Sequence, residues 1–176
     1  MDFKTITTPF TTEKIKTLRA GDAALLTGVI ITARDAAHER ITRGLAKGDA
    51  PPFDFDGQAV YYAGPAPAPP GRVIGSAGPT TSSRMDAYAP RLIAEGLRVM
   101  IGKGPRSEPV LDAIREHCGV YFAAIGGAGA LLSLCVKDSQ IIAYADLGPE
   151  AVYKLTVSEL PLIVAADCYG GNIYSV

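Results

Sequence analysis

The segment from Gly75 to Asp86 combines small residues, four hydroxyl side chains and an arginine, which together suit the binding of an anion. A turn that leads from a strand into a helix points free backbone N–H groups and the positive end of the helix toward a ligand. Within this segment, Arg84 can bind a carboxylate through two parallel hydrogen bonds. The hydroxyl residues at 80–83 are equally typical of a helix cap, so the local sequence leaves both interpretations open.

A second candidate is the segment from Thr32 to His38, which also lies between an apolar strand pattern and a helix pattern. Arg34 and His38 are four residues apart and therefore share one helix face. Arginines from two such junctions, Arg34 and Arg84, can hold the two ends of a dicarboxylate. The alternative is that Arg34 forms a surface ion pair and that His38 is a solvated helix residue, and for His38 we favour this alternative.

A third candidate is Lys103, which stands between two glycines directly after an apolar run. Glycine neighbours let the ammonium approach a ligand closely, where it acts as a point charge or a proton donor. The segment lacks the remaining pattern of a nucleotide P-loop. The glycines at 126–129 lack the spacing of a dinucleotide fingerprint, and we expect them to serve close helix packing.

The three cysteines, Cys118, Cys135 and Cys168, form no CxxC pair. This spacing argues against a disulfide framework and against a cluster site, and it favours small buried residues in a reducing cytoplasm. The chain has 176 residues, 48% of them hydrophobic, with a formal net charge of −1. It fits one domain with one core, and it carries too little positive charge for broad contact with nucleic acid or anionic membrane. We find no signal peptide or membrane span, and we expect a soluble protein.

Apolar runs alternate with helical patterns, which predicts an α/β fold with a mixed sheet or a second sheet layer. Capping-box spacings at Thr32 and Ser83 predict helix starts, and Gly48 predicts a helix end. The four prolines within 64–71 predict a stiff surface loop that can also pack against a partner, and the segment 170–174 predicts a turn or a partner contact. The predicted strands are 23–31, 59–63, 72–75, 98–102, 120–125, 141–145, 152–157 and 162–166; the predicted helices are 34–46, 84–96, one capped by Ser107 with Pro109 in its first turn, and one opened by the glycines at 126–129.

Six motifs occur in one order along nearly the whole chain. They are Leu26-Thr-Gly-x-Ile-x-Thr-Ala-Arg-Asp-Ala-Ala-His38, Tyr61-Tyr-Ala-Gly-Pro-x-Pro67, Ile74-Gly-Ser-Ala-Gly-Pro-Thr-Thr-Ser-x-Arg-Met-Asp86, Met100-Ile-Gly-Lys-Gly104, Ala143-Tyr-x-Asp-Leu-Gly-Pro-Glu-Ala151 and Gly170-Gly-Asn-Ile-Tyr174. In this series the chain resembles the β subunit, or C-terminal domain, of class I iron–sulfur fumarate hydratases and the related L-tartrate dehydratases.

The resemblance implies a swivelling β/β/α domain, related to the mobile domain of aconitase, that spans residues 1–176. It implies a hydro-lyase that reversibly hydrates fumarate to (S)-malate. It also implies a four-iron four-sulfur cluster, held by three cysteines of a partner α subunit and not by this chain, that acts as Lewis acid on the substrate hydroxyl. The expected assembly is a cytoplasmic heterodimer or heterotetramer.

The same resemblance implies roles for individual residues. Arg34 and Arg84 would bind the substrate carboxylates, Lys103 would support the bound anion and share in catalysis, and Thr80 would be the base at carbon three. A threonine hydroxyl is a poor base unless nearby cations lower its pKa, which Lys103 and the arginines would do. Tartrate or mesaconate remains an alternative substrate. A dicarboxylate-binding regulatory module without turnover and a purely structural subunit remain alternatives of other classes.

Overall fold

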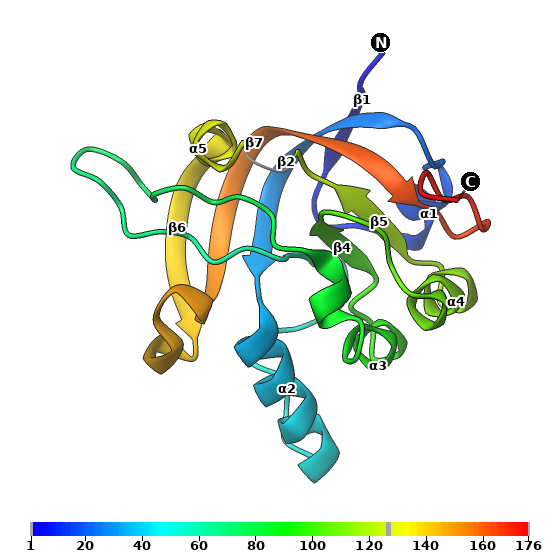
Figure 1. Ribbon diagram of the computed structural model, residues 1–176, viewed down its shortest axis with the longest axis horizontal. Coiled ribbons are helices and arrows are strands. Elements are labelled where there is room, and N and C mark those ends of the chain that lie inside the picture. Colours follow the sequence, from blue (N-terminus) through cyan, green and yellow to red (C-terminus); the bar gives the residue numbers. More distant parts are fainter. Residues whose placement is uncertain (1, 126–127, 176) are drawn as a thin grey trace.

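The computed structural model describes residues 2–125 and 128–175, and Figure 1 shows their arrangement. Seven strands form one sheet, with short helices and 3-10 turns between them. The strands are β1 (Lys4–Thr7), β2 (Ala23–Thr32), β3 (Ala59–Tyr61), β4 (Val99–Gly102), β5 (Val120–Ala123), β6 (Val136–Ala143) and β7 (Val152–Ala166); the helices are α1 (Thr12–Lys16), α2 (Asp35–Lys47), α3 (Ala89–Ala94), α4 (Glu108–Glu116) and α5 (Gly129–Leu132); the 3-10 turns are η1 (Ser82–Met85), η2 (Ser133–Cys135) and η3 (Ala145–Glu150).

The sheet is mixed and closes on itself. Strands β1 to β5 pair with their neighbours in parallel, in the order β1-β2-β3-β4-β5, and β7 runs antiparallel to β2, β5 and β6. Because β7 pairs with β2 as well as with β5, the strands β2, β3, β4, β5 and β7 form a ring. The prediction of an α/β domain with a mixed sheet is confirmed.

The central strands are buried on both faces, which explains their continuous apolar sequences. Along β3, Ala59 and Tyr61 belong to the cluster inside the ring, whereas Val60 and the following Tyr62 belong to a second cluster under the helices. Figure 1 shows α2, α3 and α4 grouped outside the ring on one side. This two-sided packing holds the carboxyl ends of the parallel strands in fixed positions relative to one another.

Helix α2 ends as the sequence predicts, at Gly48 in the left-handed conformation with φ 85°. Its predicted start is wrong in detail. The N-cap residue is Arg34 and makes no side-chain cap, while the hydroxyl of Thr32 accepts a hydrogen bond from the backbone N–H of Tyr153 at 3.2 Å. The capping-box reading fails because Thr32 is still part of β2 and turns its hydroxyl toward β7.

The predicted helix over 84–96 is right only in part, because the α-helix there, α3, spans Ala89–Ala94. The chain forms η1, turns, and begins α3 at Ala89, so that Pro90 occupies the first turn of a helix, where a missing N–H is harmless. The capping-box reading of Ser83 and Asp86 fails because the Asp86 carboxylate accepts hydrogen bonds from Arg106 and Ser107 instead. Ser107 does occupy the N-cap position of α4, with Pro109 in its first turn as predicted, but its side chain makes no cap hydrogen bond.

Several strand boundaries differ from the prediction. Residues 72–75 form no strand; Gly75 donates to the carbonyl of Ala66 at 2.9 Å and ties the proline loop to the following segment. The two predicted strands at 152–157 and 162–166 are one strand, β7, irregular at Glu159 with φ 53°. Strand β6 covers only the start of the predicted 141–145 and begins earlier. The predicted helix that begins with the glycines at 126–129 lies partly outside the described residues. Strand β1 and helix α1 were not predicted.

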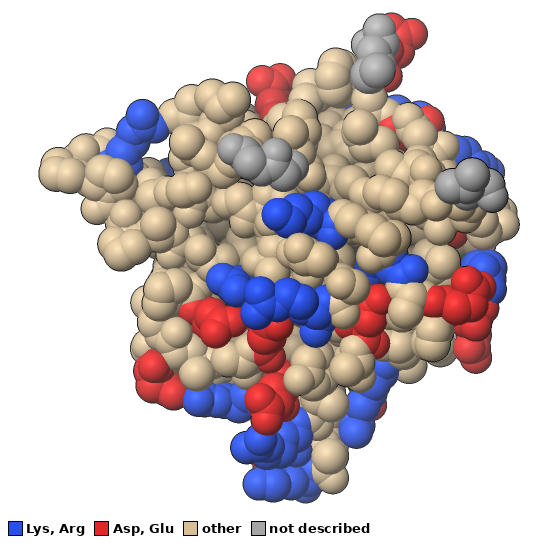
Figure 2. Space-filling model, viewed as in Figure 1, with Lys and Arg blue, Asp and Glu red and all other residues tan. Residues whose placement is uncertain are grey.

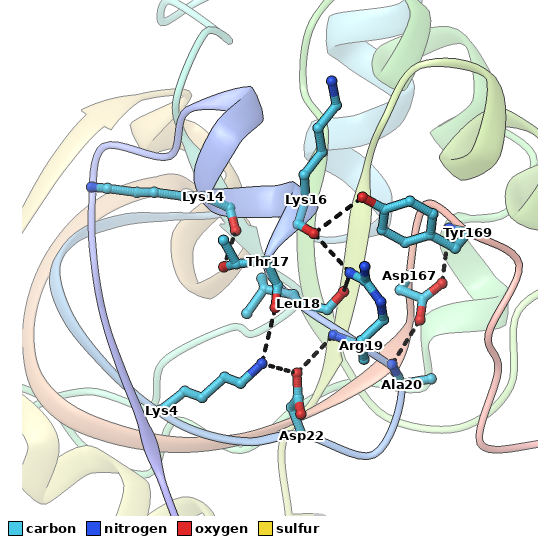
Figure 3. A network of polar contacts seen from close by, with 10 residues as sticks. All are labelled: Lys4, Lys14, Lys16, Thr17, Leu18, Arg19, Ala20, Asp22, Asp167 and Tyr169. Carbon is cyan, nitrogen blue, oxygen red and sulfur yellow. Dashed lines mark hydrogen bonds and ion pairs between the residues drawn. The ribbon is translucent and has the colours of Figure 1, made fainter.

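The segment 170–174 forms a turn that anchors the carboxyl end of the chain. The buried carboxylate of Asp167 accepts hydrogen bonds from the backbone of Ala20 at 2.8 Å and of Gly171 at 2.9 Å. Arg19 lies over the ring of Tyr169, 3.8 Å from its centroid, and Figure 3 shows this network beside the start of β2. In the described part of the chain, no helix is long and apolar enough to cross a membrane.

Candidate functional site

The candidate residues from three separate segments meet at the carboxyl ends of neighbouring parallel strands. Arg34 follows the end of β2, and Lys103 follows the end of β4. Strand β3 pairs with both β2 and β4, so its own end lies between these two side chains. In α/β proteins with parallel strands, whether the sheet is open or closed, ligands bind at this edge, where the loops leave the strands.

The loop from Gly75 to Asp86 returns to the same edge. The backbone N–H of Thr80 donates to the carbonyl of Tyr62, directly after β3, at 2.6 Å. Thr81 then pairs with Lys103 in an isolated parallel bridge, and Ser82 donates its backbone N–H to the carbonyl of Lys103 at 2.9 Å. Thr80 is thereby held between the ends of β3 and β4.

Arg84 and Arg34 share one carboxylate, that of Asp35. Arg84 donates from Nε to Oδ1 of Asp35 at 2.9 Å, and Oδ2 of the same carboxylate lies 3.8 Å from Nη2 of Arg34. The side chain of Arg84 is 53% exposed, whereas that of Arg34 is 25% exposed. Asp35 therefore brings the two predicted carboxylate-binding arginines together and neutralises part of their charge.

Arg34 keeps hydrogen-bonding capacity for a ligand. Its Nε is buried without a hydrogen-bond partner among the described residues and lies 3.7 Å from Oε1 of Glu150. Gly64 allows this placement, because a Cβ at that position would lie 3.1 Å from Cδ and Nη1 of Arg34 and 2.9 Å from the carbonyl of Pro149. Because its side chain is 25% exposed while Nε is buried, Arg34 can offer its terminal nitrogens to a carboxylate.

Lys103 and Thr80 are both half-buried at this edge. Within the described part of the chain, Lys103 forms no ion pair with a carboxylate closer than 4.0 Å. Figure 2 shows basic side chains gathered over η1 and the start of α2, with acidic side chains beside them. The chain as a whole is nearly neutral, so this positive charge is local, as an anion site in such a chain requires.

A second ion pair lies beneath the loop and was missed by the sequence analysis. The side chain of Arg106 has no exposed surface, and its Nε donates to Oδ1 of Asp86 at 2.7 Å. Its guanidinium carbon lies 5.3 Å from the ring centroid of Tyr62 and 5.0 Å from that of Tyr121. Sequence alone cannot distinguish a buried arginine of this kind from a solvated one, because its partners come from three separate segments.

His38 is buried, so the expectation of a solvated helix residue is wrong. It is 1% exposed and packs edge-on against Tyr62, with ring centroids 5.3 Å apart. Its Nδ1 lies 2.9 Å from the carbonyl of Arg34 and must carry the proton, because a carbonyl oxygen only accepts. Burial lowers the pKa of His38 to about 4, which keeps the ring neutral. His38 thus stabilises the backbone at Arg34 through this hydrogen bond.

The described residues of this chain do not fit an iron–sulfur cluster. Across residues 2–125 and 128–175, no group of three His, Cys, Asp or Glu side chains is arranged to hold a metal ion. Cys118, Cys135 and Cys168 are free and partly buried against the core inside the ring. Burial and the neighbouring Cys118 raise the pKa of the Cys168 thiol to about 11, whereas a cluster ligand is a thiolate.

The chain is similar to known proteins along most of its length. The model of a family described as the fumarase C-terminus matches residues 3–176. The chain is similar to the aerobic class I fumarate hydratase of Escherichia coli K12, with 38% identity over 151 residues, which is 85% of this chain and 28% of that protein. It is similar to fumarate hydratase 2 of Leishmania major, with 38% identity over 157 residues, which is 88% of this chain and 28% of that protein.

A third relative matches over most of its own length. It is a putative L(+)-tartrate dehydratase subunit beta of Methanocaldococcus jannaschii, with 39% identity over 170 residues, which is 93% of this chain and 87% of that protein. The chain therefore spans less than a third of the fumarate hydratases that it matches but nearly all of a protein named as a subunit.

Proposed function

This chain belongs to the fumarase C-terminus family, and on that premise we propose that it is the β subunit of an iron–sulfur-dependent hydro-lyase that reversibly hydrates fumarate to (S)-malate. The observation that carries the proposal is the joining of Arg34 and Arg84 through Asp35, at the strand edge that also holds Thr80 and Lys103. In this proposal, residues 1–176 act as one domain that supplies substrate binding and proton transfer.

The cationic residues bind the substrate. A dicarboxylate carries two negative charges, so cationic side chains on two adjacent loops can bind one carboxylate each. A bidentate arginine fixes both the position and the orientation of a carboxylate. Arg84 uses its Nε for Asp35, which leaves its terminal nitrogens for one substrate carboxylate. Arg34 binds the other carboxylate, and Lys103 adds a positive charge that stabilises the negative charge developing on the substrate.

Thr80 is the base that takes the proton from carbon three during dehydration. Its backbone is fixed to Tyr62, and its neighbour Thr81 pairs with Lys103, which supports a role for its hydroxyl beside the cations of the site. Positive charges nearby favour the deprotonated form of a hydroxyl, which is the form that accepts the proton. In the hydration direction the same group returns the proton to carbon three.

The group that removes the substrate hydroxyl belongs to a partner. The described side chains of this chain provide no cluster site, and the similarity to a protein named as subunit beta supports a separate α subunit that carries a four-iron four-sulfur cluster. Exposed apolar residues support contact with such a partner; Val73, Ile125 and Leu131 are 46%, 60% and 68% exposed. We expect a heterodimer or a heterotetramer in the cytoplasm, where the free cysteines stay reduced.

Tartrate or mesaconate remains the alternative substrate, since one relative is named for tartrate and the cations fit any dicarboxylate of this size. A regulatory module that binds a dicarboxylate without turnover is the alternative of another class. The proposed role of Thr80 as a base favours the enzyme, because a sensor needs no base.

Anaerobic co-expression with the cluster-bearing partner tests the proposal. We expect a complex that contains iron and sulfide and converts malate faster than tartrate or mesaconate. Faster conversion of tartrate or mesaconate would change the substrate but keep the reaction class. A complex that carries a cluster and converts none of the three would refute the enzyme function, and calorimetric binding of malate to it would then support the regulatory module.

A further inference from the structure

Arg106 is a fully buried charge within a domain that places few charges in its interior. Besides its hydrogen bond to Asp86, it has only long contacts, with its Nη1 3.4 Å from the hydroxyl of Tyr62 and 3.5 Å from the sulfur of Met100. Its Nη2 is buried with no hydrogen-bond partner among the described residues. Burying an ion pair costs desolvation energy that often exceeds the attraction between the charges, so stability alone is a weak reason for its presence.

The carboxylate of Asp86 uses both of its oxygens to connect two segments. Oδ1 accepts from Arg106, and Oδ2 accepts from the backbone N–H of Ser107 at 2.7 Å. Asp86 directly follows η1, which carries Arg84, and Ser107 directly precedes α4. The ion pair therefore fixes the end of the substrate-binding loop to the first turn of a helix that packs on the sheet.

Tyr62 and Tyr121, which lie around Arg106, connect it to the remaining site residues through hydrogen bonds. The carbonyl of Tyr62 accepts the backbone N–H of Thr80. The hydroxyl of Tyr121 lies 2.9 Å from Oγ of Ser82 and donates to the carbonyl of Gly104 at 2.8 Å, and Ser82 in turn accepts the backbone N–H of Lys103 at 3.0 Å.

The loop packs closely against the end of β4 at Gly102, where a side chain would not fit. A Cβ at Gly102 would overlap Oγ of Ser82 and would lie 2.9 Å from a ring carbon of Tyr62. The strand end thus leaves room for the loop to lie directly against it, with Ser82 fully buried in the contact.

From these contacts we propose that Arg106 is a positioning residue of the active site, which together with Asp86, Tyr62 and Tyr121 sets Thr80, Arg84 and Lys103 at fixed positions relative to one another. The inference rests on the proposed function of that site. Because Asp86 neutralises Arg106 locally, the pair acts through geometry and adds little to the positive charge that the substrate meets. A displacement of about 1 Å at the reacting groups is enough to reduce turnover by about a hundredfold.

Arg106→Lys in the assembled enzyme tests the proposal, with Arg40→Lys as the matched control. Lysine keeps the charge but cannot keep the planar contact between two aromatic rings. Arg40 lies on α2 and forms an exposed pair with Asp146 at 2.7 Å, which is separate from the pair of Arg106 and Asp86. We expect Arg106→Lys to lower kcat/KM at least tenfold and Arg40→Lys to change it less than twofold.

Amide hydrogen exchange separates this inference from the function on which it rests. We expect exchange at the amides of Thr80, Ser82, Arg84 and Lys103 to accelerate at least tenfold in Arg106→Lys, with little change in β7. Should Arg106→Lys fail to fold, Tyr121→Phe decides by the same two readouts, since it removes only the hydroxyl that joins Ser82 to Gly104.

Unchanged exchange at these amides in the folded variant overturns the positioning role, whatever the activity. A loss of kcat/KM equal to that of the control overturns it as well. If the wild-type complex converts no dicarboxylate, the proposed function fails, and the exchange data still decide whether Arg106 holds the loop.

Discussion

Arg84 donates from Nε to Oδ1 of Asp35 at 2.9 Å, although the two residues are 49 positions apart in the sequence. This bond joins the loop before α3 to the first turn of α2. It orients one guanidinium before any ligand arrives, and a ligand then loses less conformational freedom in binding.

We predict that Asp35→Ala raises KM for the dicarboxylate about tenfold, or ~1.4 kcal/mol, because Arg84 loses the partner that orients it. Steady-state kinetics on the assembled enzyme measure the change. Asp146→Ala, which breaks the exposed pair with Arg40, is the control and leaves KM within twofold. A lower KM in Asp35→Ala would instead show that Asp35 competes with the substrate for the arginine.

Thr80→Ala should lower kcat by about a hundredfold or more and leave KM within about threefold, because a base acts on the transition state more than on the bound substrate. Its neighbour Thr81 has an exposed side chain and serves as the matched control, so Thr81→Ala keeps kcat. An equal kcat in the Thr80→Ala and wild-type enzymes would exclude Thr80 as the base.

Replacing Arg34 or Arg84 by lysine should raise KM about tenfold each, since lysine keeps the charge but lacks the second parallel hydrogen bond. Arg43→Lys, on the exposed face of α2, is the control and leaves KM unchanged. If both site variants keep the wild-type KM, the dicarboxylate binds elsewhere.

The burial of His38 predicts that the free energy of unfolding depends on pH. Burial lowers its pKa in the folded chain to about 4, below the value near 6.5 of an unfolded histidine. Below pH 6.5 the unfolded chain therefore binds a proton that the folded chain does not, and stability falls as the pH drops from about 6.5 toward 4. The loss over this window is about 3 kcal/mol.

Urea unfolding at pH 7 and at pH 4.5 measures this loss. His38→Asn keeps a donor for the carbonyl of Arg34 but does not titrate, so its stability should fall less than that of the wild type over the same interval. An identical decrease in both proteins would assign the acid sensitivity to other groups.

The candidate site residues were easier to predict than the residues that hold them in place. Arg34, Thr80, Arg84 and Lys103 belong to local patterns, in which a strand ends and a polar or glycine-rich turn follows, and the structure brings all four to one edge of the sheet. Their contact with a ligand and their roles stay predictions.

The supporting residues could not be predicted because their roles depend on distant segments. Asp86 matched a capping box by its spacing, yet its partner is Arg106, 20 residues further along the chain. His38 lay at a helix position that is solvated in many helices, but here Tyr62 and Tyr88 cover it. The central strands β2 to β5 were predicted because burial on both faces produces continuous apolar runs, whereas a local pattern contains no information on which polar side chains meet.

The rate of fumarate hydration, measured while this chain is added to its separately purified cluster-bearing partner, tests the central claim most directly. We predict no hydration by either chain alone, a rate that rises with the amount of this chain and then saturates, and no such rise when Thr80→Ala is added in its place. Full activity of the partner alone, or a cluster-bearing complex that hydrates no fumarate at any proportion of the two chains, would contradict the claim.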